Sequence, residues 1–185
     1  MREVDRLAVL GLGSVLMGDD AAGAHVLCHL ESEWELPAEV QMLDLGTPGP
    51  ELARIIEGLD ALIVVDTART RDGVPGEVLL LRRDEILRGP APERLSPHDP
   101  SLRGALAAAE LLGTAPREVL LVGIVPEEVS LGLSLSPAVR AALPQAALAV
   151  TAELERLGFP VLRRAVPRPP EVWWEIPEEV QPCRN

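Results

Sequence analysis

Short apolar runs alternate with helical patterns along most of the chain, which is typical of β-α-β units around a mainly parallel sheet. The strongest strand pattern is residues 61–65, an uninterrupted apolar run that stops at Asp66. The first strand is expected at residues 7–11, a compact apolar run that leads into a glycine-rich turn. Further strands are expected at residues 40–44, 77–82 and 119–125. The pattern therefore indicates an α/β fold.

Apolar residues at helical spacing predict the helices that connect these strands. We expect helices at residues 19–31, 50–57, 101–112 and 137–157. Asp19 or Asp20 can cap the first of them. The last is expected to be interrupted or bent near Pro144, because proline cannot donate the helical hydrogen bond.

The size and composition of the chain fit one packed domain with a tail. A length of 185 residues, 47% of them hydrophobic, suffices for one sizeable core. We assign residues 1–160 to this domain. Residues 161–185 carry repeated prolines, acidic residues and the pair Trp173-Trp174 without a clear period. They are expected to form a Pro-rich irregular C-terminal tail that adds little to the core.

Charge and composition disfavour several partner classes. The formal net charge of -12 repels phosphate backbones and anionic lipid, so neither nucleic acid nor membrane is an expected partner. No apolar run approaches the roughly 18 residues of a membrane span, and no export signal is evident at the N-terminus. We expect a cytoplasmic monomer. Cys28 and Cys183 form no pair motif, and Cys28 is interpreted as a core residue of the first helix.

A glycine-rich turn follows the first expected strand at residues 11–20. It suggests dinucleotide binding, but Leu16 stands where the fingerprint needs its third glycine. Asp19 and Asp20 would also repel a pyrophosphate at the start of the helix. In the plainest interpretation these aspartates are only the cap and first-turn acid of an ordinary helix.

Asp66 and His98 are further candidates for chemistry. Asp66 ends a fully apolar strand, so it should lie at the carboxyl edge of the sheet, where ligands bind in open α/β folds. The alternative is that Asp66 caps the following turn through Thr67. His98 lies in a long Pro-rich loop, a segment type that is often functional. His25 and His29 have a spacing that suits a metal, but they flank the apolar stripe, so a solvated helix side is favoured.

The sequence contains no pattern for covalent catalysis. The motif Gly-x-Ser-x-Gly is absent, because the second residue after Ser14 is Leu16 and the motif needs glycine there. Nor is there a zinc-type cysteine cluster or a Cys–His arrangement.

Five segments, taken together and in order, resemble the motifs of the nickel–iron hydrogenase maturation protease family. The resemblance runs to about Gly158 and rests on the acidic pair in residues 19–23, on residues 43–52, on Leu62-Ile63-Val64-Val65-Asp66, on Ser96-Pro97-His98 and on residues 122–127. Two features depart from the family pattern. Ser14 stands where asparagine is usual, and the tail beyond Gly158 is longer than in compact members.

The resemblance implies a metal-binding cluster of Asp20, Asp66 and His98, which are also the implied catalytic residues. It implies a three-layer α/β fold (phosphorylase/hydrolase-like), with a mainly parallel twisted sheet and helices on both faces. The implied activity is that of an endopeptidase that removes the C-terminal extension of a nickel-loaded hydrogenase large-subunit precursor.

The metal expected at this cluster is a divalent ion, nickel supplied by the substrate, and no nucleotide cofactor is expected. Two carboxylates and an imidazole suit such an ion. Two alternatives are a nucleotide-binding module, which the failed glycine fingerprint disfavours, and a non-catalytic nickel-binding chaperone of the large subunit. The chaperone would use the same ligands without cleaving a bond.

Overall fold

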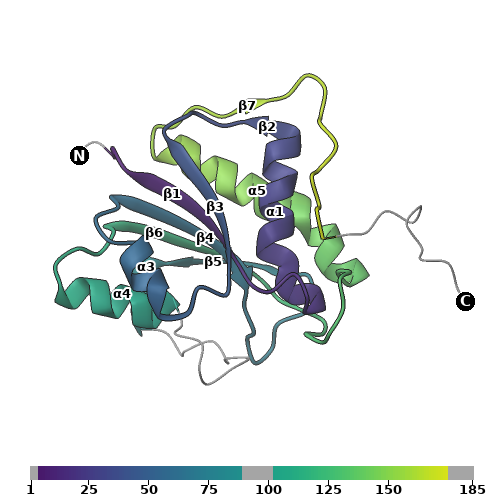
Figure 1. Ribbon diagram of the computed structural model, residues 1–185, viewed down its shortest axis with the longest axis horizontal. Helices are drawn as coiled ribbons and strands as arrows, with labels where there is room; N and C mark the ends of the chain where they lie inside the picture. The colour runs from purple at the N-terminus through teal and green to yellow at the C-terminus, as the bar shows by residue number, and fades with distance from the viewer. Residues whose placement is uncertain (1–3, 89–101, 175–185) are drawn as a thin grey trace, which may run out of the picture.

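The computed structural model describes residues 4–88 and 102–174, and a twisted sheet lies at its centre (Figure 1). In the described part of the chain this sheet has five strands in the order β3-β1-β4-β6-β5. The strands are β1 (Leu7–Leu12), β3 (Val40–Gly46), β4 (Ala61–Thr67), β5 (Val78–Arg82) and β6 (Glu118–Ile124). All neighbours are parallel except β5, which runs antiparallel to β6.

The burial of each strand follows its position in the sheet. β1 is buried along its whole length, and β4 is buried from Ala61 to Val65, so these strands are apolar on both faces. The edge strands β3 and β5 are partly exposed and carry polar residues. The apolar run that ends at Asp66 therefore marks a central strand, as the sequence predicted.

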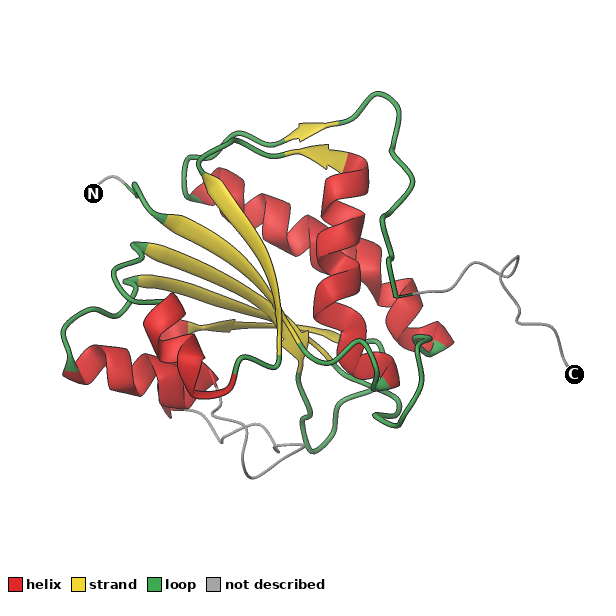
Figure 2. Ribbon diagram, viewed as in Figure 1, coloured by secondary structure: helices red, strands yellow, loops and turns green. Residues whose placement is uncertain are grey.

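Helices cover both faces of the sheet (Figure 2). The helices α1 (Ala22–Glu33) and α5 (Pro137–Arg156) share one core with β1, β4 and β6. On the opposite face a second core holds α2 (Leu52–Ile55), α3 (Arg83–Arg88) and α4 (Leu102–Leu111). The expected three-layer α/β architecture is confirmed. Within the described ranges, no helix combines the length and apolarity needed to cross a bilayer.

Two helices differ from the sequence-based expectation. Of the two expectations for Pro144, the interruption is wrong, since α5 is continuous from Pro137 to Arg156, and the bend stays a prediction. Pro144 is exposed there, so the carbonyl that loses its helical partner can bind water instead. Helix α3 was not expected, since a helix of six residues is too short to show a helical period. Its first-turn acids, Asp84 and Glu85, are the one local signal for it.

The first part of the C-terminal segment packs along α1, and we call residues 162–174 the strap. It begins as β7 (Leu162–Arg163), antiparallel to β2 (Trp34–Glu35). The Arg168 N–H then donates to the Ser32 carbonyl at 2.9 Å, and the Cys28 thiol donates to the Glu171 carbonyl at 3.4 Å.

Trp174, the last residue of the strap, packs against the first turn of α1. Its side chain is 6% exposed and meets the His25 ring edge-on, with 5.0 Å between ring centroids. Trp173 is 77% exposed. The expectation that the tail adds little to the core does not hold at Trp174, although most other residues of the strap are exposed. The domain boundary at residue 160 stays a prediction, and residues 175–185 lie outside the described residues.

Candidate functional site

A tight turn after β1 brings Asp20 to the carboxyl edge of the sheet. Gly13 in this turn has φ of +112°, and its N–H donates to the Gly46 carbonyl at 2.9 Å. A Cβ atom on Gly13 would lie 1.8 Å from the carbonyl oxygen of Asp20, so only glycine fits. The 3-10 helix η1 (Gly18–Ala21) follows and carries Asp20. The glycine at position 13 thus permits the close approach of Asp20 to the turn.

Thr67 contacts both of the carboxylates predicted for the site. Its hydroxyl donates to Asp20 Oδ1 at 3.2 Å, and its backbone N–H donates to Asp66 Oδ1 at 2.7 Å. Asp20 Oδ2 accepts the N–H of Ser14 at 2.7 Å. Asp20, Asp66 and Thr67 are all partly buried. Both predicted carboxylates therefore contact Thr67 at the carboxyl edge of the sheet, Asp20 from η1 and Asp66 from β4.

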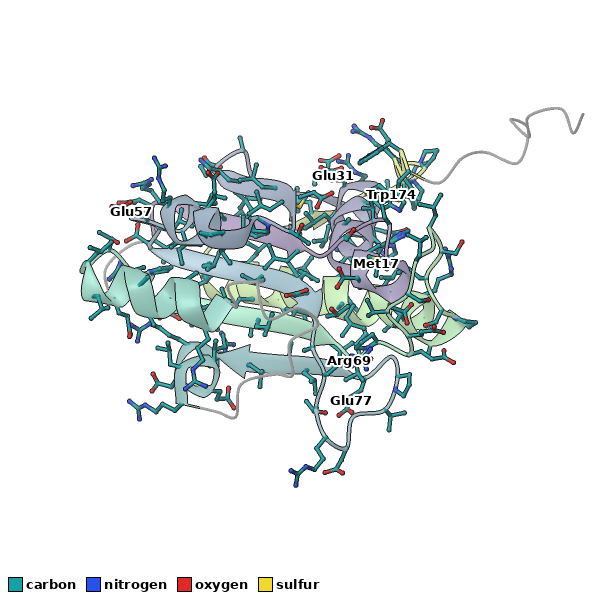
Figure 3. All side chains as sticks on the ribbon, turned by 60° about the horizontal axis from the view of Figure 1, so that its bottom comes forward. Met17, Glu31, Glu57, Arg69, Glu77 and Trp174 are labelled. Atoms are coloured by element: carbon teal, nitrogen blue, oxygen red, sulfur yellow. The ribbon has the colours of Figure 1, made fainter. Side chains whose placement is uncertain are left out.

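The surrounding turns lie at the same end of the sheet. Figure 3 shows Met17, from the turn after β1, and Arg69, from the segment after β4, on this side of the molecule. Parallel pairing explains the arrangement, because Gly11 of β1 is in register with Val65 of β4. If Asp66 only caps the turn, the hydrogen bond from Thr67 N–H to its carboxylate is explained. The second hydrogen bond, from the Thr67 hydroxyl to Asp20, is not explained by a cap.

Asp19 has a different role from the expected helix cap. It makes no capping hydrogen bond to η1 or α1 and is only 1% exposed. Its carboxylate accepts backbone N–H bonds from Glu127 at 2.9 Å, Glu128 at 3.2 Å and Ser136 at 2.6 Å. These donors are 108 to 117 residues away in the chain, so no local sequence signal identifies them. Asp19 thus joins the segment before α5 to the turn that carries Asp20.

Ser14, where the resemblance leads us to expect asparagine, still closes the turn. The Ser14 hydroxyl accepts the N–H of Leu16 at 3.3 Å, a bond that an asparagine side chain also makes in such turns. Since the Ser14 N–H, and not its side chain, contacts Asp20, the carboxylate keeps its donor with either residue.

His98, the third predicted metal ligand, lies outside the described residues. Within residues 4–88 and 102–174, His, Cys, Asp and Glu form no group of three that could hold a metal ion. The assignment of Asp20, Asp66 and His98 as metal ligands and catalytic residues therefore stays a prediction.

The expected solvated position of His25 and His29 is wrong. His25 is 4% exposed and packs against Trp174. His29 is half-buried beside Trp34, and this burial lowers the pKa of its imidazole, although Glu33 acts in the opposite direction. Both rings fill the space between α1 and the segments that cover it. Their spacing on the helix thus reflects packing.

The pair formed by Asp20 and Asp66 has the chemistry of a partial cation site. An ionised carboxylate has about four acceptor positions, so the bonds from Ser14 and Thr67 leave Asp20 capacity for a cation. Carboxylate oxygens and imidazole nitrogens bind divalent ions of the first transition series. The described residues therefore fit two ligands of a divalent ion, with further positions open to other donors.

The sequence of the chain is similar to those of known proteases. A family model described as hydrogenase maturation protease matches residues 24–153. The chain is 34% identical to the hydrogenase 2 maturation protease of Escherichia coli K12 over 165 residues, which cover 88% of this chain and 96% of the relative.

Solved structures show the same similarity. The hydrogenase maturating endopeptidase HybD from E. coli superposes with a TM-score of 0.78 at 32% identity, covering 86% of this chain and 98% of that one. The [NiFe] hydrogenase maturation protease HybD from Thermococcus kodakarensis superposes with a TM-score of 0.60 at 28% identity, over 80% and 98% of the two chains.

Proposed function

The chain belongs to the hydrogenase maturation protease family and is an endopeptidase, and we propose that its substrate is the nickel-loaded large-subunit precursor of a nickel–iron hydrogenase. The bond that it hydrolyses in this proposal releases the C-terminal extension of the precursor. The observation that carries the proposal is the carboxylate pair of Asp20 and Asp66, joined through Thr67 at the carboxyl edge of the sheet. The alternative of a non-catalytic nickel chaperone is not favoured, because the relatives are proteases.

Nickel in the precursor, and not a metal resident in the protease, is the proposed recognition element. Asp20 and Asp66 come from separate segments, as does the predicted third ligand His98. Ligands from separate segments, here η1 for Asp20 and β4 for Asp66, can complete the coordination of an incoming ion without enclosing it. Binding to the nickel would hold the scissile bond at a fixed offset from the carboxylates, and such positioning contributes several kcal/mol to many reactions, roughly 7–11 at the upper end.

Water is the proposed nucleophile, which makes the site aspartic in type. A bound divalent ion supplies positive charge that polarises a nearby water or carbonyl oxygen. One carboxylate of the pair accepts the proton of the attacking water as its oxygen bonds to the peptide carbonyl carbon. The carbon–nitrogen bond then breaks, and the proton passes to the leaving amine. Thr67 holds Asp20 in place throughout by its hydrogen bond.

The setting of the reaction completes the proposal. The proposed setting is the cytoplasm, where the protein acts as a monomer that meets its precursor transiently. The net charge of -12 disfavours nucleic acid and anionic lipid as partners.

The test uses metal-free protease and purified precursor, either loaded with nickel or lacking it, in buffer without free metal. Mass spectrometry should show loss of the C-terminal peptide from the loaded form only. A loaded precursor that binds the protease but keeps its full mass would reject cleavage. Equal cleavage of both forms, or a strict need for metal bound in advance to the protease, would reject recognition through nickel.

A further inference from the structure

Two exposed leucines lie on two segments that are hydrogen-bonded to each other, and one of these segments leads to Asp20. Leu16 is 55% exposed in the turn that leads to Asp20, and Leu131 is 86% exposed in the segment between β6 and α5. The two segments are joined by a parallel bridge between Met17 and Gly132. We call Leu16 and Leu131 the leucine rim.

Backbone hydrogen bonds hold the leucine rim in one arrangement. The Gly132 N–H donates to the Leu16 carbonyl at 3.0 Å, and the Gly18 N–H donates to the Gly132 carbonyl at 2.8 Å. Beneath the rim, the buried Asp19 carboxylate accepts the N–H groups of Glu127 and Ser136, which lie on either side of Leu131. A backbone that is already held in this way loses little conformational freedom when its side chains bind a partner.

One residue of the leucine rim lies in the turn that carries Asp20. Leu16 lies between Ser14 and Asp20, and the Ser14 N–H contacts the Asp20 carboxylate. Leu131 also lines a cavity of about 440 Å³ together with Gly18 and Asp19. A peptide whose scissile bond reaches Asp20 meets the turn that carries Leu16, and the segment that carries Leu131 is hydrogen-bonded to that turn.

The charges nearby restrict what can bind there. Glu127 and Glu128 are exposed in the segment that carries Leu131, and the whole chain has a net charge of -12. An acidic segment would be repelled, and a strongly polar one would lose its hydration against the leucines without gaining partners. The chemistry fits an apolar stretch of peptide with neutral or basic neighbours.

We propose that the leucine rim is the docking contact for the precursor, and that it binds an apolar, non-acidic segment beside the scissile bond. This inference rests on the proposed function and names the surface through which the substrate is held. It makes Leu16 and Leu131 specificity residues that contribute to binding and leave the hydrolytic groups in place.

The test compares Leu16→Ala, Leu131→Ala and the double variant with wild-type protein, using nickel-loaded large-subunit precursor as the probe. The KM should rise about five- to tenfold for each single variant, because apolar contacts at the centre of an interface have effects of this size. The value of kcat should stay within about twofold, since uniform binding and not catalysis is lost. The thermal midpoint should not move, because both side chains are exposed.

Leu111→Ala is the matched control, because Leu111 is 90% exposed and belongs to α4, which packs on the opposite face of the sheet. It should cleave like the wild type. Failure of the wild type to cleave would reject the proposed function. Wild-type cleavage with an unchanged KM in the double variant would overturn the docking proposal alone. A loss confined to kcat would also overturn it, by making the leucines part of the catalytic arrangement.

Discussion

The Thr67 hydroxyl donates a hydrogen bond to Asp20 Oδ1 at 3.2 Å, although the two residues are 47 positions apart in the chain. The same residue donates its backbone N–H to Asp66. Thr67 therefore sets the orientation of Asp20 relative to Asp66. Residues that orient metal ligands in this way usually change metal affinity or activity by about 10- to 100-fold when they are replaced.

Replacement of Thr67 by valine should reduce kcat/KM for nickel-loaded precursor by about 10- to 100-fold. Valine keeps the shape and the backbone N–H but cannot donate to Asp20. Thr67→Ser retains the hydroxyl and should recover most of the activity. Steady-state kinetics, with circular dichroism to verify folding, would check this prediction. Equal activities for Thr67→Val and Thr67→Ser would contradict the orienting role.

Removing the charge of a predicted catalytic group should abolish processing without unfolding the protein. Asp20→Asn and Asp66→Asn keep the size of each side chain, and His98→Ala removes the predicted third ligand. The mass of nickel-loaded precursor after incubation gives the readout. Asp72→Asn is a suitable control, because Asp72 is exposed in the turn before β5. Near-normal cleavage by a folded Asp66→Asn variant would remove the basis of the site assignment.

Asp19→Asn should destabilise the protein although the change is nearly isosteric. The asparagine NH₂ group would face backbone N–H donors that now share the Asp19 carboxylate, and an unsatisfied buried donor costs about 1–3 kcal/mol. The thermal midpoint should fall by roughly 2–4 °C for each kcal/mol. Glu128→Gln is the control, because its exposed side chain leaves the backbone bond to Asp19 unchanged. A thermal scan in which the two variants match the wild type would contradict this account of Asp19.

Trp174→Ala should cost about 3 kcal/mol of unfolding free energy, because the indole is buried against His25. Trp173→Ala should change it by less than about 0.5 kcal/mol, since that side chain is exposed. Truncation after Arg163 should cost at least as much as Trp174→Ala, because it also removes the bonds of the strap to Ser32 and Cys28. Urea titrations measure all three. A small effect of the truncation would show that the strap contributes little, as its composition alone suggested.

Glu153 should make stability depend on pH. It is 4% exposed, and although burial alone would raise the pKa of its carboxyl, hydrogen bonds from Arg156 and Arg82 lower that pKa below its ordinary value of 4.5. A carboxyl whose pKa is lowered by folding stabilises the protein above its unfolded pKa, and this contribution disappears as the pH falls through the folded pKa.

Glu153→Gln should therefore be less stable than the wild type at pH 7, by about 2 kcal/mol. The difference should shrink as the pH falls below 4.5. Urea titrations of both proteins across this range check the sign. Glu155→Gln, at an exposed position of the same helix, provides the control. A deficit that stays constant down to acidic pH would contradict the role of the charge.

Local patterns were sufficient to predict most of the architecture. A central parallel strand must be apolar on both faces, so the runs that became β1, β4 and β6 were visible without any partner. The place of Asp66 followed from the same rule, because the residue that ends such a strand lies at the carboxyl edge. Elements of one or two turns, such as α3, were missed because they are shorter than the period that identifies a helix.

The sequence by itself determined the α/β alternation, the carboxylates near the ends of β1 and β4, and the motif order that resembles the protease family. Only the tertiary structure decided what each polar group contacts. Asp19 and Asp20 are adjacent and chemically identical, yet Asp19 binds the segment before α5 while Asp20 meets Thr67. His25 looked solvated until the strap was seen to cover it. Hydrogen bonds and burial depend on partners brought in from distant parts of the chain, and a local period contains no information about them.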